Sequence, residues 1–293
     1  MNSKDLLAIY NNQLLLGNIK KMNTLELEDA VLIYREPQNG EEVGEWGLLD
    51  YRGKDNIIEL WEAITFLANP ELLRNKKISH INAPGLKEVP AGAFCGCMEL
   101  ITFFAPNCKK IGKSAFEGCR NLKAIDFSNV ELIGVMAFKE CFSIKEIELP
   151  YVRQICAGAF QSCKKLMKVH CSNLVYIESA AFFYCQALRE VIAPSVRIVG
   201  GHAFSQCISL VDIEMPVAEG IDDYAFYKCV QLRKAIFPKV ETIGKFVFSR
   251  CNALMELNIV SYKNIKSKVF SEIVALPGLR TFKFNNRIYN RRK

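Results

Sequence analysis

Cysteine and histidine are the residues of this sequence whose chemistry could support a metal site, a disulfide or a nucleophile. The 293 residues include 12 cysteines and 3 histidines. Cys95 and Cys97 are one residue apart and no second close pair complements them, whereas zinc sites combine such pairs or a His-x-x-x-His spacing. His80, His170 and His202 stand far apart. We therefore predict no metal and no cofactor.

Catalysis by a Cys–His pair has one candidate, Cys171 beside His170. If both lie in a strand, neighbouring side chains point to opposite faces and cannot share a proton. Phosphate-binding and nucleotide-binding glycine patterns are absent from the sequence. The sequence therefore predicts a protein that is not an enzyme.

The cysteines are explained better by a repeat. A Phe-x-x-Cys-x-x-Leu unit recurs at a constant interval, and its period falls within the range that is typical of leucine-rich solenoids. Phenylalanine occupies positions 94, 116, 138, 160, 182, 204, 226, 248 and 270, and cysteine positions 97, 119, 141, 163, 185, 207, 229 and 251. Parallel, identical side chains seldom offer disulfide geometry, and free cysteine suits a buried column. We therefore expect reduced core thiols and a cytoplasmic location, with the cell surface, reached by non-classical export, as the alternative.

Each repeat also contains a Leu-x-x-Ile-x-Leu run that alternates as a short strand does. A turn follows, and then a further apolar position, isoleucine in most repeats, that glycine often follows, at Gly112, Gly134, Gly200 and Gly244. Glycine there indicates a corner with positive φ. The Ala-Phe-x-x-Cys segment is expected to form a helical or 3₁₀ turn on the opposite side. One turn cannot bury its own apolar face, so the turns must stack.

This pattern resembles the BspA-like branch of the leucine-rich-repeat proteins. The resemblance rests on Ile111-Gly112, Ala115-Phe116, Cys119, Leu122 to Ile125, Ile147 and Pro150. It implies an α/β repeat solenoid, a curved right-handed array of 22-residue turns whose concave strand face binds proteins. Members of the family include bacterial surface adhesins, and the family has no catalytic motif.

The array defines four segments of the chain. Residues 1–55 are expected to form a small α+β element, with a helix over 4–16 and a hairpin of 25–35 with 43–51 packed by Trp46 and Tyr51. Residues 56–77 show three- and four-residue apolar spacing, which predicts a capping helix broken at Pro70. Residues 78–285 form the solenoid, closed by a last turn at Leu279, Phe282 and Phe284. Residues 286–293 form a basic tail that we expect to be solvated.

The strand face is the predicted binding surface, because residues that flank the buried strand position must point outward. Phe104, Ile192 and Ile236 stand there among charges, which is typical of a partner site, although scattered exposed apolar residues are also common. The predicted partner-binding residues are Phe104, Glu146, Glu148, Lys168, His170, Glu190, Ile192, Asp212, Glu214, Lys234 and Ile236. A second candidate combines Phe183, Tyr184 and Tyr227 on the opposite edge.

The predicted function is a non-catalytic scaffold that binds a protein partner. A cell-surface adhesin for host or matrix proteins is the alternative. The net charge of +7 leaves nucleic-acid contact through the basic tail as a third and weaker reading. No apolar run approaches the length that a membrane span requires, so no span is expected, and we expect a monomer.

Overall fold

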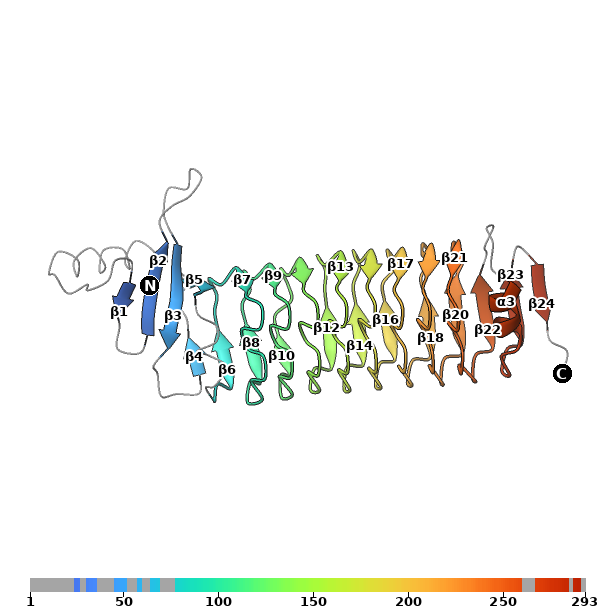
Figure 1. Cartoon of the computed structure of the whole chain (residues 1–293), viewed down its shortest axis with the longest axis horizontal. Coiled ribbons are helices and arrows are strands. Elements are labelled where there is room, and N and C mark those ends of the chain that lie inside the picture. Colours follow the sequence, from blue (N-terminus) through green and yellow to red (C-terminus); the bar gives the residue numbers. More distant parts are fainter. Residues whose placement is uncertain are drawn as a thin grey trace.

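The computed structural model shows a row of stacked turns between a small N-terminal sheet and a C-terminal hairpin (Figure 1). It describes residues 24–26, 30–35, 45–51, 57–59, 64–68, 77–259, 267–284 and 287–290. Each turn contributes one short strand to each of two long sides of the row, and the side chains between them form one continuous hydrophobic core. The predicted repeat solenoid is confirmed. The α/β class is not, because α3 (Ser267–Val274) is the one helix among the described residues.

The first strand of each turn forms one side, whose outward surface we call the strand face. Most successive strands pair in parallel, one repeat apart, as in Glu146 with Lys168 and Lys168 with Glu190. The hydrogen-bonded ladder is interrupted between β10 and β12 and between β16 and β18, so this side consists of three sheets. The strands are β4 (Ile57–Glu59), β6 (His80–Asn82), β8 (Thr102–Phe104), β10 (Ala124–Ile125), β12 (Glu146–Glu148), β14 (Lys168–His170), β16 (Glu190–Ile192), β18 (Asp212–Glu214), β20 (Lys234–Phe237), β22 (Glu256–Ile259) and β23 (Thr281–Phe284).

The second strand of each turn forms an eight-stranded parallel sheet on the other side, which we call the second sheet. Its isoleucine or valine points into the core in nearly every turn. The strands are β7 (Glu88–Val89), β9 (Lys110–Ile111), β11 (Leu132–Ile133), β13 (Gln154–Ile155), β15 (Tyr176–Ile177), β17 (Ile198–Val199), β19 (Gly220–Ile221) and β21 (Thr242–Ile243).

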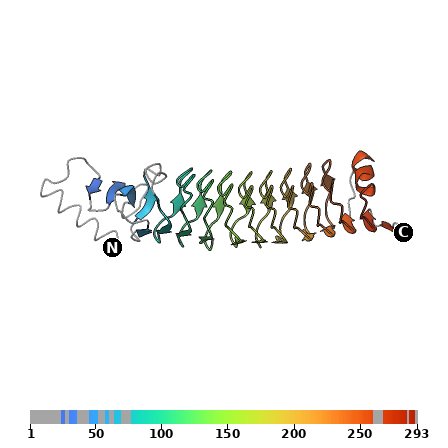
Figure 2. The ribbon, with the colours of Figure 1, turned by 90° about the horizontal axis from the view of Figure 1, so that it is seen from below.

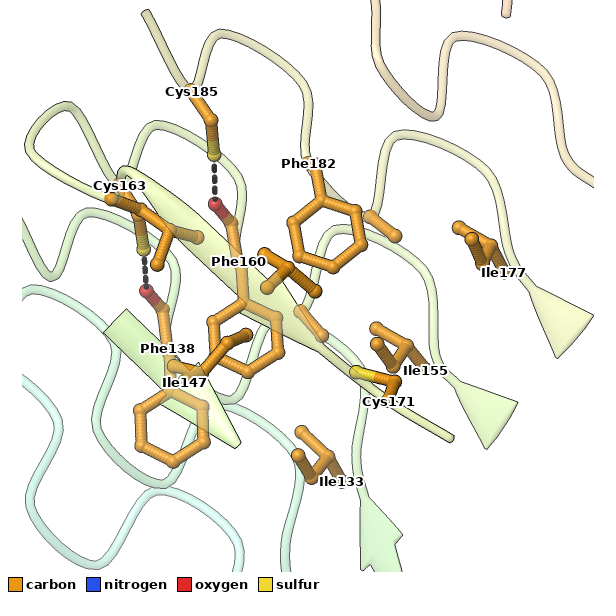
Figure 3. Packing of buried hydrophobic residues seen from close by; sticks show 14 of the residues in the cluster. Ile133, Phe138, Ile147, Ile155, Phe160, Cys163, Cys171, Ile177, Phe182 and Cys185 are labelled. Carbon is orange, nitrogen blue, oxygen red and sulfur yellow. Dashed lines mark hydrogen bonds between the residues drawn. The ribbon is translucent and has the colours of Figure 1, made fainter. Parts of the chain in front are cut away.

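The phenylalanine column runs through the core as a stack of rings (Figure 3). Phe160 lies 5.2 Å from Phe138 and 5.6 Å from Phe182 between ring centroids, and the ring planes differ by 8° and 4°. From Cys119 onward, each cysteine of the column donates its thiol to the carbonyl of a phenylalanine in the preceding turn, as Cys163 does to Phe138 at 3.2 Å and Cys185 to Phe160 at 3.1 Å. The cysteines therefore connect adjacent turns as buried, reduced hydrogen-bond donors.

The Ala-Phe-x-x-Cys segment is a series of tight turns and not a helix. Ala115 and Cys119 donate their amides within the turn, to Gly112 and Phe116, whereas the amide of Phe116 donates to Ala137 in the next turn. Alternate amides thus bond to the neighbouring turn, as in a sheet. In these segments the backbone has positive φ at the position two before and the position two after the phenylalanine, as at Ser114 (52°) and Gly118 on either side of Phe116. Positive φ interrupts a right-handed helix.

The glycines that follow the second-sheet isoleucine serve a different purpose from the predicted one. Gly112, Gly134, Gly200 and Gly244 do not have positive φ. Instead, a Cβ at Gly134 would lie 2.7 Å from the backbone nitrogen of Lys113 in the preceding turn. Glycine is used there because the backbones of adjacent turns approach closely.

The N-terminal residues cap the row with strands. β1 (Thr24–Glu26), β2 (Ala30–Arg35), β3 (Glu45–Tyr51) and β5 (Ile64–Leu67) form a four-stranded sheet. β2 pairs antiparallel with β3, as the predicted hairpin requires, but the single strand predicted over 25–35 is divided into β1 and β2, which pair with each other. The indole of Trp46 is fully buried in the common core. The predicted helix over 4–16 and the side chain of Tyr51 lie outside the described residues.

The predicted capping helix over 56–77 is wrong for the residues described there. β4 pairs in parallel with β6, and β5 pairs in parallel with β3. Apolar spacing in short runs does not distinguish a helix from strands. Here β4 continues the parallel sheet and pairs with the edge of β6 that would otherwise be open.

The C-terminal end closes as predicted through Leu279 and Phe282, both buried, and β23 pairs in parallel with β22. The described part of the basic tail is not free. β24 (Arg287–Asn290) returns antiparallel to β23, so this part of the tail covers the last strand.

Both views show the turns stacked in a nearly straight row (Figures 1 and 2). The curvature that the resemblance implied is not seen. A solenoid curves when one side carries helices about 10 Å wide and the other carries strands about 4.8 Å apart. Here both sides carry strands, so their spacing matches.

Candidate functional site

The structure places all the predicted partner-binding residues on the outward positions of the strand face. Phe104 lies on β8, Glu146 and Glu148 on β12, Lys168 and His170 on β14, Glu190 and Ile192 on β16, Asp212 and Glu214 on β18, and Lys234 and Ile236 on β20. In each of these strands the residue between the outward positions is buried. The alternation inferred from the sequence therefore holds in every one of these turns.

The outward apolar residues of the strand face do not form one patch. Ile192 and Ile236 are two turns apart with Glu214 between them, and Phe104 lies four turns from Ile192, roughly 19 Å at a strand spacing of about 4.8 Å. The side chain of Ile192 is 48 % exposed and that of Phe104 is 49 % exposed. Ile192 is thus the exposed apolar residue nearest the middle of the strand face.

The strand face is acidic although the chain is basic. Its two outward columns, from Thr102 to Asn258, carry seven carboxylates and two lysines. Lys168 approaches Glu146 at 3.7 Å, and His170 Nε2 lies 2.6 Å from a carboxylate oxygen of Glu190. Within the described part of the chain, Glu148, Asp212 and Glu214 form no ion pair. The surroundings of Ile192 are therefore rich in uncompensated negative charge.

Charges on the second sheet and directly before its strands are arranged differently. Lys110 pairs with Glu88 at 2.8 Å, Lys109 with Glu131 at 2.9 Å, and Arg197 with Glu219 at 2.6 Å. Each pair joins equivalent positions of adjacent turns. The repeat can therefore neutralise charge between turns, and it does so less on the strand face.

The second predicted candidate, Phe183 with Tyr184 and Tyr227, belongs to an aromatic ladder along the edge formed by the Ala-Phe-x-x-Cys turns. The ring of His202 stacks on Tyr224 at 4.9 Å, and Tyr224 stacks on Phe246 at 5.1 Å. Phe183 meets His202 edge-on, and Tyr227 meets Tyr224 edge-on. These rings mainly contact one another, so the ladder is accounted for by contact between turns.

The sequence analysis missed a cluster at the corner between the cysteine turn and the strand face. Arg120, Phe142 and Lys164 occupy the same repeat position in three successive turns. The guanidinium of Arg120 lies 5.3 Å and the ammonium of Lys164 4.9 Å from the centroid of the Phe142 ring. The sequence did contain a signal for this cluster. When the repeats are aligned, Phe142 falls between Arg120 and Lys164 in one column.

Buried thiols of the core are poor nucleophiles. Burial raises the pKa of the Cys171 thiol to about 12 and that of Cys185 to about 12, and a thiol, unlike a thiolate, is unreactive. Cys171 is buried while His170 faces outward. Among the described residues no group of three or more His, Cys, Asp or Glu side chains could hold a metal ion.

Comparison with known families decides the classification. The sequence profile described as "BspA type Leucine rich repeat region" matches six copies, over residues 69–189 and 175–291. The chain belongs to the BspA-type leucine-rich-repeat family. Proteins of this family are generally non-catalytic, and the leucine-rich-repeat fold typically serves as a protein-interaction scaffold.

Solved leucine-rich-repeat structures resemble this chain in fold. A leucine-rich repeat protein from Bacteroides ovatus is 21 % identical, with 89 % of this chain and 76 % of that chain covered and a TM-score of 0.57. A leucine-rich repeat protein from T. pallidum is 20 % identical, with 83 % and 92 % covered and a TM-score of 0.46. No curated protein matches the sequence. In the part of the chain that the structure describes, no helix is long and apolar enough to cross a membrane.

Proposed function

We propose that this protein is a non-catalytic scaffold whose protein partner binds the middle of the strand face. The observation that carries the proposal is the position of Ile192, a half-exposed aliphatic side chain on β16 beside outward-facing charges. Interfaces commonly combine a central apolar anchor with a polar rim. On this face the anchor is Ile192 and the rim is formed by Glu148, His170 and Glu214.

The packing of the face on the core supports the same proposal. The strands on either side of Ile192 are held by the core, and His170 pairs with Ile192 in parallel register. A partner therefore meets a surface that is already formed, which reduces the ordering cost of binding. The unpaired carboxylates supply charge that a partner could complement without breaking an existing ion pair.

The substitution Ile192→Asp tests the proposal, with Tyr176→Asp as its matched control. Ile192 is 48 % exposed on the strand face and Tyr176 is 46 % exposed on the second sheet, so both changes leave the core intact. Affinity capture should recover the same partner with wild type and Tyr176→Asp, and Ile192→Asp should weaken that binding about tenfold or more. Equal binding by all three proteins would remove the strand face from the proposal.

The proposal includes a reducing compartment, the cytoplasm, because all twelve cysteines lie in described residues and are free thiols. A thiol count on denatured, unreduced protein purified from its native source should give about twelve. Extensive oxidation would instead favour the cell-surface alternative.

A further inference from the structure

Unpaired cations recur at three positions of the repeat along the corner between the cysteine turn and the strand face, and we call this set the basic corner. Lys164 and Lys165 follow Cys163 directly, and the other members each precede a strand of the strand face. Its members are Lys123, Lys145, Lys164, Lys165, Arg189 and Arg233. All six side chains are exposed, and within the described residues none forms an ion pair.

The absence of partners distinguishes these cations from others on the same solenoid. Lys109, Lys110, Lys139 and Arg197 each reach a glutamate in an adjacent turn, at 2.6 to 2.9 Å. The repeat therefore has a ready means of neutralising a cation. At this corner Arg120 uses it, at 3.4 Å from Glu140, whereas the six members of the basic corner do not. Lys123 and Lys145 occupy the same position of successive turns. Neighbouring like charges repel one another on a sheet surface, so this pair carries an electrostatic cost that no ion pair among the described residues offsets.

The ring of Phe142, at the same corner, restricts the class of ligand that can bind there. Phe142 lies between Arg120 and Lys164, which belong to the preceding and following turns, and Lys164 is also 5.8 Å from the Tyr184 ring. Cation–ring contacts hold long side chains in place. Because cations already cover the Phe142 ring, it offers no open face on which a nucleobase could stack.

We infer that the basic corner binds an acidic, extended segment of a partner protein along the solenoid axis. Charge complementarity identifies the ligand as a carboxylate-rich chain, and the lack of an open ring disfavours single-stranded nucleic acid. The adjacent strand-face column is acidic at Glu146, Glu190 and Asp212, which confines such a segment to the corner. This surface is distinct from the one around Ile192, and the inference does not depend on the strand-face proposal.

Fluorescence anisotropy with synthetic probes tests the inference on the full chain. The probes are a twelve-residue peptide rich in Asp and Glu, the same peptide with Asn and Gln at those positions, and a single-stranded oligonucleotide of equal charge. The corner variant carries Lys145→Glu, Lys165→Glu and Arg189→Glu. The control variant carries Lys113→Glu, Arg153→Glu and Lys239→Glu, which are exposed cations elsewhere, so both variants change the net charge equally.

The acidic peptide should bind wild type in a salt-sensitive manner, and the amide peptide should not bind. The corner variant should lose about tenfold or more in affinity, because three attractive charges become repulsive, while the control variant should change far less. Equal losses in the two variants would show that net charge alone acts. Failure of the peptide to bind, or tighter binding of the oligonucleotide, would also overturn the inference.

Discussion

Raising the pH from about 8 to about 10 is expected to unfold the solenoid, because its core thiols must remain protonated. Burial raises the pKa of the Cys185 thiol from 9.0 to about 12. Burial likewise raises the pKa of five other thiols of the column, those of Cys119, Cys141, Cys163, Cys207 and Cys229. In the unfolded chain these thiols ionise at ordinary pKa values.

The raised pKa values determine that the free energy of unfolding falls as the pH rises. A group whose pKa is raised in the folded state stabilises that state fully below its unfolded pKa, and the stabilisation is lost as the pH rises toward the folded pKa. Above about pH 9 each such thiol lowers the free energy of unfolding by about 1.4 kcal/mol per pH unit. Six of them give about 8 kcal/mol per pH unit, comparable with the whole stability of a typical domain, roughly 5–15 kcal/mol.

Urea denaturation followed by circular dichroism between about pH 8 and about pH 10 measures this dependence. The informative control is the double variant Cys163→Ala, Cys185→Ala. It should be less stable at about pH 8 but should show a shallower pH dependence, by about 3 kcal/mol per unit above about pH 9, because two titrating groups are gone. Tyrosine and lysine titrate alike in both proteins. Parallel curves for the two would contradict the assignment of these thiols to the core.

Replacing Phe182 by alanine should destabilise the protein by about 3–5 kcal/mol. The ring is fully buried, and it stacks on Phe160 at 5.6 Å and on Phe204 at 5.3 Å. The substitution removes contacts to both neighbouring turns and leaves a cavity at the centre of the row. Stability in a repeat array depends on such contacts between neighbours.

Thermal unfolding combined with amide hydrogen exchange measures this effect, because a long array can open locally before it unfolds as a whole. Exchange should accelerate most in the turns around residues 160, 182 and 204. Phe104→Ala is the control, since that ring is 49 % exposed on β8, and its effect should stay within about 1 kcal/mol. An equal effect of the two substitutions would show that the phenylalanine column does not carry the stacking.

The repeat itself was predictable from the sequence because every turn applies the same physical requirements. Phenylalanine, cysteine and leucine recur at fixed positions, and their columns gave the stacking, the buried thiols and the alternation that places Ile192 outward. Because the same residue types recur in successive turns, none of these predictions depended on any single residue.

The parts that could not be predicted depend on relations between turns. The role of Gly134 comes from the backbone of the preceding turn, and nothing in its own turn distinguishes this from a need for positive φ. The residues before the array resembled a helix because short apolar runs fit either structure, and the edge of β6 decides the outcome. The sandwich of Phe142 between Arg120 and Lys164 required that three turns be aligned and their charges compared.

A photo-reactive residue placed at position 192 or at position 176 tests the central claim most directly. Each position is half exposed in the wild type, at the middle of opposite sides of the row. With the partner bound, irradiation should cross-link it to position 192 on the strand face and not to position 176 on the second sheet. Cross-linking from position 176 with none from position 192 would contradict the account.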